Sequence, residues 1–266
     1  MAYRVWGDQA SARGIVVCVH GLTRNASDFD ELASALSHDD WCVVCPDIVG
    51  RGESDWLHLS EGYALPQYAS DLTALLAKLN TEDVHWIGTS MGGLIGLVLA
   101  ATSGHPLRSL FLNDIGPFVP QSALAEILAY ITDMPLYPDV PSAAEALRER
   151  YQSSGPLDDE TWERVAVGST RKVEGGYRLS YDPAIADPYA EVAKDDIDVW
   201  TLWDRITLPV FTLRGEISPI LLKETADEMS RRGAESRLVE CAGVGHAPWL
   251  KDEEQISIVR NWLDAQ

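Results

Sequence analysis

The chain lacks the features that would place it in a membrane or on a secretory route. None of its apolar runs reaches the roughly 18 residues needed to span a bilayer. Its first residues, MAYRVWGDQASARG (1–14), lack the basic region followed by an apolar stretch that a secretory signal requires. We therefore expect a soluble, cytoplasmic protein with no membrane partner.

Cysteine is scarce, and its placement argues against a metal site. The chain has four cysteines. Cys42 and Cys45 lie in WCVVCPD (41–47), which has the pattern of a strand. Residues three apart on a strand point to opposite faces, so these two thiols cannot share a metal. No second CxxC is present, and we expect free thiols, a reducing compartment and no metal or other cofactor.

Basic residues are outnumbered by acidic ones. The chain has 21 Lys and Arg against 41 Asp and Glu, which gives a formal net charge of -20. A field of this sign repels nucleic acid and anionic membranes and favours solubility. The acidic residues are scattered without a long acidic tail, so the charge excludes a nucleic-acid partner but identifies no partner of its own.

Alternating strand and helix patterns are present instead. Hydrophobic residues make up 46% of the chain, enough to bury a sizeable core. Apolar runs predict strands at 14–21, 41–47, 83–88, 107–114, 208–215 and 235–243. Amphipathic or apolar patterns predict helices at 27–37, 63–80, 90–103, 220–233 and 253–265. Repeated strand–helix units indicate an α/β protein with a doubly wound, mostly parallel β-sheet.

The pattern changes between residue 116 and about residue 200. Helical stretches at 121–133, 142–152 and 158–167 replace the strands, and a polar segment containing Gly175 and Gly176 follows as a small hairpin or loop. This insert is too long for a plain loop. We expect a core formed by 1–117 and 201–266, and a helical cap formed by 118–200.

Ser90 occupies the most informative motif. GTSMGG (88–93) follows the strand DVHWI and opens the apolar helix MGGLIGLVLAA. A G-x-S-x-G sequence in this strand–turn–helix setting is typical of a nucleophile elbow, in which the serine is exposed at the carboxyl edge of the sheet. The alternative is a serine that caps the helix, with glycines that serve packing only.

A serine nucleophile needs a base, and His246 is the best placed histidine. It lies in GVGHAPWL, after the strand 235–243 and before the last helix, so it belongs to a loop at the same sheet edge. His20 ends the first strand and is expected to hold its loop by hydrogen bonds. The remaining histidines are expected at the surface: His38, His58, His85 and His105.

An oxyanion needs backbone donors near the serine. The segment HGL follows the first strand at the same edge of the sheet. The N–H groups of Leu22 and Met91 are the natural pair, and their side chains are free to vary.

These motifs together resemble the α/β-hydrolases, of the capped, serine-dependent kind. The matching segments fall in the family's order: VHGLTRN (19–25), PDIVGRGESDW (46–56), GTSMGG (88–93), NDIGP (113–117) and GVGHAP (243–248). Two more segments are similar to a bacterial subgroup with a helical cap: RLSYDPAIADP (178–188) and LRGEISPILL (213–222). The resemblance implies a Ser–acid–His triad and hydrolysis of esters or related acyl compounds. It also implies that Asp47 and Arg51 brace their loop.

The acidic residue of the implied triad is missing from the position where the family usually carries it. In the similar subgroup, an aspartate is expected two positions after Ile217, where this chain has Pro219. Asp114, at the end of the strand 107–114, is the favoured replacement, because some family members carry the acid there. Glu216 is the alternative acid. Asp114 could also be a loop cap, and the acid could be absent.

The sequence thus predicts a serine hydrolase of carboxylesterase type that acts on a small-molecule ester or acyl substrate. The same fold and triad serve carbon–carbon bond hydrolases, lactonases and cofactor-free perhydrolases. Pro219 also leaves open a small-molecule binding module with an impaired triad. Arg24 and Asn25 follow the oxyanion loop, where they could contact substrate or brace the loop.

Overall fold

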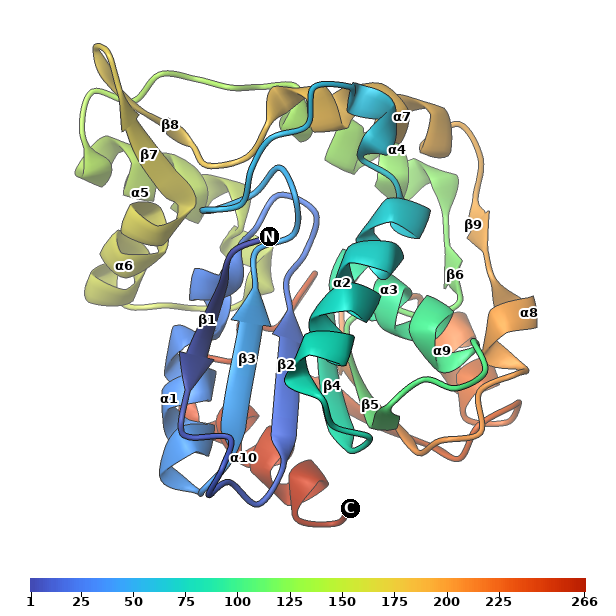
Figure 1. The fold of residues 1–266 in the computed structure, drawn as a ribbon. Helices are drawn as coiled ribbons and strands as arrows, with labels where there is room; N and C mark the ends of the chain where they lie inside the picture. The colour runs from blue at the N-terminus through green and yellow to red at the C-terminus, as the bar shows by residue number, and fades with distance from the viewer.

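A seven-stranded sheet forms the centre of the molecule. The computed structural model describes residues 1–266, and the strand order is β1-β3-β2-β4-β5-β10-β11 (Figure 1). Only β1 runs antiparallel, against β3. The strands are β1 (Tyr3–Trp6), β2 (Ile15–Val19), β3 (Cys42–Pro46), β4 (Val84–Thr89), β5 (Leu107–Asn113), β10 (Val210–Gly215) and β11 (Ser236–Cys241). The doubly wound, mostly parallel α/β fold is therefore confirmed.

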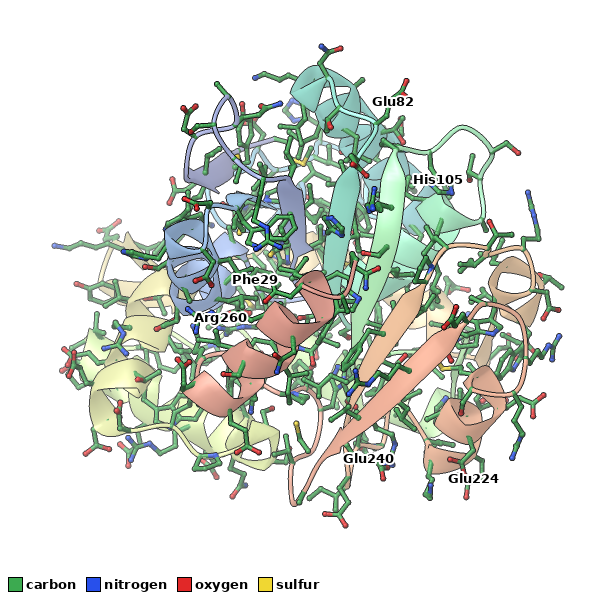
Figure 2. All side chains as sticks on the ribbon, turned by 90° about the horizontal axis from the view of Figure 1, so that it is seen from below. Phe29, Glu82, His105, Glu224, Glu240 and Arg260 are labelled. Carbon is green, nitrogen blue, oxygen red and sulfur yellow. The ribbon has the colours of Figure 1, made fainter.

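Helices cover both faces of this sheet. Figure 2 views it from below, with Arg260 marking α10 on one side and Glu224 marking α9 on the other. On the first face lie α1 (Asp30–His38) and α10 (Glu253–Leu263). On the other lie α2 (Leu65–Leu79), α3 (Met91–Ala100) and α9 (Lys223–Met229). Burial on both faces explains why the central strands are continuous apolar runs rather than alternating ones.

The two faces have separate apolar clusters. Cys42 belongs to the cluster under α2 and α3, and Cys45 belongs to the cluster under α1 and α10. The prediction that these thiols point to opposite faces is confirmed. All four cysteines are free. None of the helices is both long and apolar enough to cross a bilayer.

The segment between β5 and β10 lies at the end toward which the parallel strands point (Figure 1). Its helices are α4 (Gln121–Ile131), α5 (Val140–Arg150), α6 (Asp159–Ser169), α7 (Ala186–Val192) and α8 (Trp200–Trp203). It also has strands: β6 (Phe118–Val119) pairs with β9 (Ile197–Asp198), which the sequence patterns did not predict. Around Gly175 and Gly176, where a hairpin or a loop was expected, β7 (Thr170–Val173) forms a hairpin with β8 (Gly176–Leu179). We call this segment the cap.

The surface location expected for His85 is wrong. This side chain lies inside β4 and is only 5% exposed. Its Nδ1 is 2.7 Å from Ser109 Oγ, and its ring packs edge-on against Trp41 and Trp262. Burial lowers the pKa of His85 to about 4. A polar residue in a central parallel strand is covered by helices on either face, so its polarity did not indicate exposure.

Candidate active site

Ser90 sits on a sharp turn between β4 and α3. Its backbone has φ 53° and ψ −118°, which is a strained conformation for a residue with a side chain. A Cβ atom on Gly88 would lie 2.4 Å from the carbonyl oxygen of Gly92, and one on Gly92 would lie 2.0 Å from that of Val19. Both glycines of the G-x-S-x-G motif are therefore required because backbone approaches backbone at the turn.

The structure brings Ser90, His246 and Asp114 into one chain of hydrogen bonds. The distance from His246 Nε2 to Ser90 Oγ is 2.9 Å, and that from His246 Nδ1 to Asp114 Oδ2 is 2.6 Å. Asp114 is wholly buried, while the His246 side chain is 18% exposed. A serine hydroxyl, an imidazole and a carboxylate in this order can carry out nucleophilic catalysis with the imidazole as base.

Both carboxylate oxygens of Asp114 are held by the loop that follows β10. The backbone N–H of Gly215 donates to Oδ1 at 2.8 Å, and the Ser218 hydroxyl donates to Oδ2 at 2.5 Å. The Ser218 oxygen in turn accepts from the N–H groups of Ile220 and Leu221. This loop, where the family's acid was expected, thus supplies the donors that fix Asp114 at the end of the neighbouring strand. The sequence offered no sign of the part that Ser218 plays.

Glu216 points elsewhere. Its Oε2 accepts a hydrogen bond of 2.7 Å from the N–H of Gly243, at the exposed side of the loop. Pro219 follows Ser218 and carries no group that could orient an imidazole. The structure therefore places Asp114, and not Glu216, against His246.

The loop of His246 is tied to both the cap and the sheet. Ser154 Oγ, in the turn after α5, donates to the His246 carbonyl at 2.7 Å. Asn113 Nδ2, at the end of β5, donates to the carbonyl of Pro248 at 2.8 Å. The Trp249 ring packs edge-on against Tyr151 of the cap. These contacts hold the imidazole between the cap and the sheet edge.

The expected oxyanion donors also lie at the turn. The N–H of Leu22 has no acceptor within the protein, and that of Met91 is in the first helical turn, where no intrahelical acceptor exists. A Cβ atom on Gly21 would be 3.7 Å from the Cβ of Ser90, so the HGL loop approaches the elbow closely. Two donors near one hydroxyl can stabilise negative charge on an acyl oxygen.

His20 holds this loop as expected. It is wholly buried, its Nδ1 donates to the carbonyl of Gly21 at 2.7 Å, and its Nε2 accepts from the N–H of Ile48 at 3.0 Å. Burial lowers the pKa of His20 to about 4, so the ring is neutral near pH 7 with the tautomer that these bonds require.

Arg51 also braces the loop that follows β2. Its wholly buried side chain donates from Nε to the Leu22 carbonyl at 2.8 Å and from Nη1 to Val49 O and Tyr68 Oη. Asp47 acts separately, because its carboxylate accepts from the backbone N–H groups of Ala26 and Glu53. Each residue braces its loop, but the two do not pair with each other.

Two cavities meet at Ser90. The larger has a volume of about 330 Å³, and no charged residue lines it. Its walls include Leu22, Leu94, Leu124, Ile127, Tyr189 and Ile220. The smaller has a volume of about 70 Å³ and is lined by Arg24, Asp28, Tyr130, Tyr151 and His246, among others. Ser90, Leu22 and Ile127 line both cavities.

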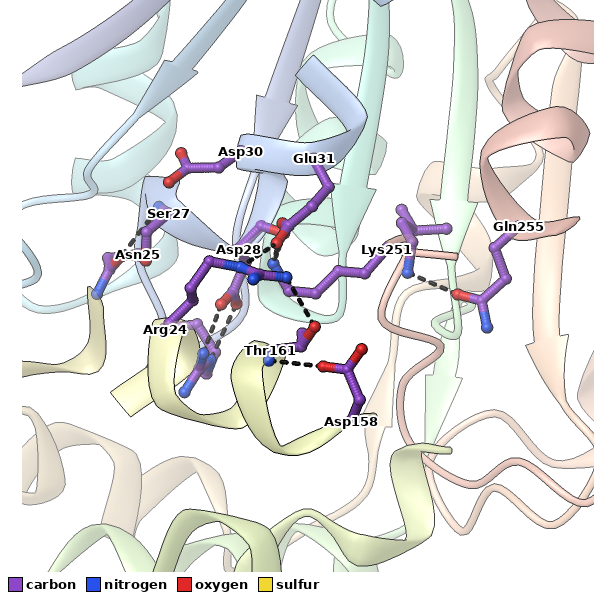
Figure 3. A network of polar contacts seen from close by, with 12 residues as sticks. Arg24, Asn25, Ser27, Asp28, Asp30, Glu31, Asp158, Thr161, Lys251 and Gln255 are labelled. Atoms are coloured by element: carbon purple, nitrogen blue, oxygen red, sulfur yellow. Dashed lines mark hydrogen bonds and ion pairs between the residues drawn. The ribbon is translucent and has the colours of Figure 1, made fainter. Parts of the chain in front are cut away.

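Arg24 lines the smaller cavity, but its charge is already paired. Its Nε and Nη2 donate to the two carboxylate oxygens of Asp28 at 2.9 and 2.5 Å (Figure 3). Lys251 joins the same network through the Asp28 carbonyl and Glu31. Arg24 is thus held rigidly, as a loop-bracing residue would be. Nowhere do three or more His, Cys, Asp or Glu side chains gather as metal ligands would.

Comparisons with known proteins identify the family of this chain. The family model of the alpha/beta hydrolase fold matches residues 14–249. A 3-hydroxybutyrate-oligomer hydrolase of Cupriavidus necator is 42% identical over 97% of this chain and 90% of its own length. The chain belongs to the α/β-hydrolase fold family, and its relatives include hydrolases.

Solved structures give the same result. A putative hydrolase from Rickettsia typhi superposes with a TM-score of 0.93 at 34% identity, covering 99% of this chain and 90% of the other. An α/β-hydrolase from Novosphingobium aromaticivorans has a TM-score of 0.89 at 37% identity, covering 99% and 93%. The likeness therefore extends over nearly the whole chain.

Proposed function

We propose that the protein hydrolyses carboxylic esters through an acyl-enzyme formed on Ser90. The hydrogen-bonded series from Ser90 through His246 to Asp114 carries this proposal. The apolar cavity that opens at Ser90 supports it, because an uncharged acyl chain fits such walls. The 42% identity to a hydrolase of 3-hydroxybutyrate oligomers favours short esters of hydroxy acids as substrates.

In this proposal His246 takes the proton of Ser90 as the serine oxygen attacks the acyl carbon. The Leu22 and Met91 N–H groups hold the oxyanion of the tetrahedral intermediate. The intermediate collapses as His246 returns the proton to the alcohol oxygen, which leaves with its bonding electrons. Water, deprotonated by His246, then attacks the acyl-enzyme and releases the carboxylic acid and free Ser90. Asp114 orients the imidazole and stabilises its protonated form throughout.

Hydrolysis of 4-nitrophenyl butyrate by purified protein tests the proposal. We expect turnover by the wild type and a loss of at least about 10³-fold in kcat for Ser90→Ala. Ser103→Ala, at an exposed position, is the matched control and should behave as the wild type. Undiminished turnover in Ser90→Ala would contradict the assignment.

A fluorophosphonate probe separates the enzyme from a binding module that keeps the fold. We expect rapid, stoichiometric labelling of the wild type at Ser90 and none in Ser90→Ala. An inert wild-type protein that still binds the ester would favour the binding module.

A further inference from the structure

The two cavities at Ser90 suit different parts of an ester. This inference rests on the proposed ester hydrolysis. His246, which must deliver a proton to the leaving alcohol, lines the smaller cavity and not the larger one. The alcohol part therefore lies on the side of the smaller cavity, and the acyl chain occupies the larger one.

The larger cavity reaches the surface of the protein. Pro66, in the first turn of α2, and Val192, the last residue of α7, both line it and are both exposed, Val192 to 47%. Ser90 lines the same cavity. The cavity thus leads from Ser90 to an opening between the start of α2 and the end of α7 (Figure 1). None of the residues that line the smaller cavity is exposed.

The walls stay apolar from Ser90 to this opening. Met91, Leu94 and Leu124 are buried wall residues, while Pro188 and Val192 belong to α7 at the opening. No charged residue lines the cavity. An alkyl chain gains free energy for each methylene group that such walls remove from water. These walls therefore suit a long uncharged chain along their whole length.

Apolar side chains continue outside the opening. Leu59 is 72% exposed, more than any other large hydrophobic side chain of the protein. It precedes the 3₁₀ turn Ser60–Gly62, which lies beside α7 and is followed by the cavity-lining Tyr63. Single exposed apolar residues are ordinary, but a group of them at the mouth of a cavity indicates a binding surface. Leu59, Pro66 and Val192 form such a group.

We propose that the larger cavity is an acyl channel open at both ends, and that Val192 controls the passage of long acyl chains at its outer end. Short acyl groups fill only the inner part beside Ser90. The end of a longer chain passes out between α2 and α7 and lies over Leu59. The protein therefore accepts esters with long uncharged acyl chains, for which a closed pocket would set an upper limit of length.

A series of 4-nitrophenyl esters from butanoate to dodecanoate tests the open end. Each ester is kept below the concentration at which it aggregates. For the wild type, we expect kcat/KM to rise by up to about fourfold for each methylene group that the walls bury, and then to level off. The value for dodecanoate should be no lower than that for butanoate.

Val192→Trp narrows the opening. We expect it to lower the ratio of kcat/KM for dodecanoate to that for butanoate by at least about tenfold. Val192→Asp places a charge at the same point without filling it, and should lower the ratio as well. Val167→Trp is the matched control, because this valine of α6 is 60% exposed and lines neither cavity at Ser90. It should keep the wild-type ratio.

Two isomeric esters test which cavity takes the chain. Methyl octanoate and heptyl acetate have the same atoms, but the long chain is on the acyl side in the first and on the alcohol side in the second. We expect kcat/KM to be at least about tenfold higher for methyl octanoate, since the smaller cavity would place the chain beside Arg24 and Asp28. Titration of the released acid gives the rates.

The proposal is overturned if the rate collapses beyond a certain acyl length, if Val192→Trp keeps the wild-type ratio, or if heptyl acetate is preferred. It is also overturned if dodecanoate is hydrolysed only once it aggregates, because Leu59 and Val192 would then belong to a lipid-binding face. Failure of the proposed ester hydrolysis looks different, because butanoate itself would not be hydrolysed or Ser90→Ala would stay active on it.

Discussion

Asp114 shows how a single residue takes its role from its neighbours. Its backbone has φ 55°, and this left-handed conformation lets the chain leave β5 with the carboxylate facing His246. Gly215 and Ser218 satisfy its two buried oxygens from the loop after β10. A buried carboxylate without such donors would be costly, so the position of Asp114 depends on that loop.

Parallel measurements on Asp114→Asn and Glu216→Gln test the assignment of the acid. The asparagine keeps the shape of Asp114 but cannot stabilise a protonated imidazole, so we expect kcat to fall by about 10³- to 10⁴-fold. Glu216→Gln should stay near the wild-type rate because its carboxylate binds Gly243. The reverse result would make Glu216 the acid. Initial rates with 4-nitrophenyl butyrate provide the measurement.

Ser218 is predicted to be a positioning residue. Ser218→Ala removes the hydroxyl that donates to Asp114 Oδ2, and we expect kcat to fall by about tenfold with little change in KM, as the loss of a hydrogen bond to a charged group implies. Ser218→Thr retains a hydroxyl and should recover most of the rate. Equal loss in both variants would indicate that the side chain matters only for packing.

The sequence could locate Ser90 and His246 as candidates because each lies in a motif at a strand end. It could only rank Asp114 above Glu216, since both follow strands that end at the same edge of the sheet. The choice depends on the direction of each side chain, which hydrogen bonds to Gly215 and Gly243 decide. Ser218 belongs to no motif, and its surroundings exist only in the folded chain.

At the scale of elements, the turn between β4 and α3 is the most constrained part of the fold. The helix starts so close to β2 that Gly92 leaves no room for a side chain beside Val19. Helix α3 is buried around most of its circumference, which explains why its sequence has no polar face.

Gly92→Ala should therefore destabilise the fold. The added methyl group would overlap the Val19 carbonyl, and overpacking of this kind costs about 1–3 kcal/mol or more. Urea unfolding followed by circular dichroism measures the free energy of unfolding. Gly21→Ala is the matched control, because its Cβ would meet only ordinary contacts of 3.7 Å or longer. Equal stability of the two variants would show that the turn relaxes readily.

Elements of the core were predictable, while those of the cap were less so. A continuous apolar run marked strands such as β2, and apolar residues at helical spacing marked helices such as α2. The strand β1 was missed because its four residues are partly exposed at the sheet edge. The hairpin of β7 and β8 is short and polar, so periodicity alone could not separate it from a loop.

At the scale of the whole molecule, buried neutral histidines link stability to pH. His20 and His85 each have a pKa lowered by burial to about 4, against 6.5 in the unfolded chain. Between these values the unfolded chain binds more protons than the folded one. Stability therefore falls as the pH is lowered from about 6.5 to about 4, and each histidine contributes a loss of about 3 kcal/mol over that range.

His85→Gln provides the measurement, because it removes one titrating group far from Ser90. We expect the decrease in the free energy of unfolding between pH 6.5 and 4 to be about 3 kcal/mol smaller than in the wild type. His58→Gln, at an exposed loop position, is the control and should keep the wild-type profile. An unchanged profile in His85→Gln would mean that this histidine is charged in the folded protein.

The placement of Asp114 directly after β5 also affects how such a chain can exchange segments with a relative. Ser90 and Asp114 both belong to the unit β4–α3–β5, and the N–H of Ser90 donates to the carbonyl of Asn113 within it. Both residues precede the cap, so exchanging the cap for that of a relative leaves their spacing untouched. The loop of His246 and the loop after β2, whose Asn25 donates to the Gly168 carbonyl of the cap, must be realigned with their new neighbours. Under the proposed function, substrate preference can thus diversify by cap exchange while Ser90 and Asp114 are inherited as one block.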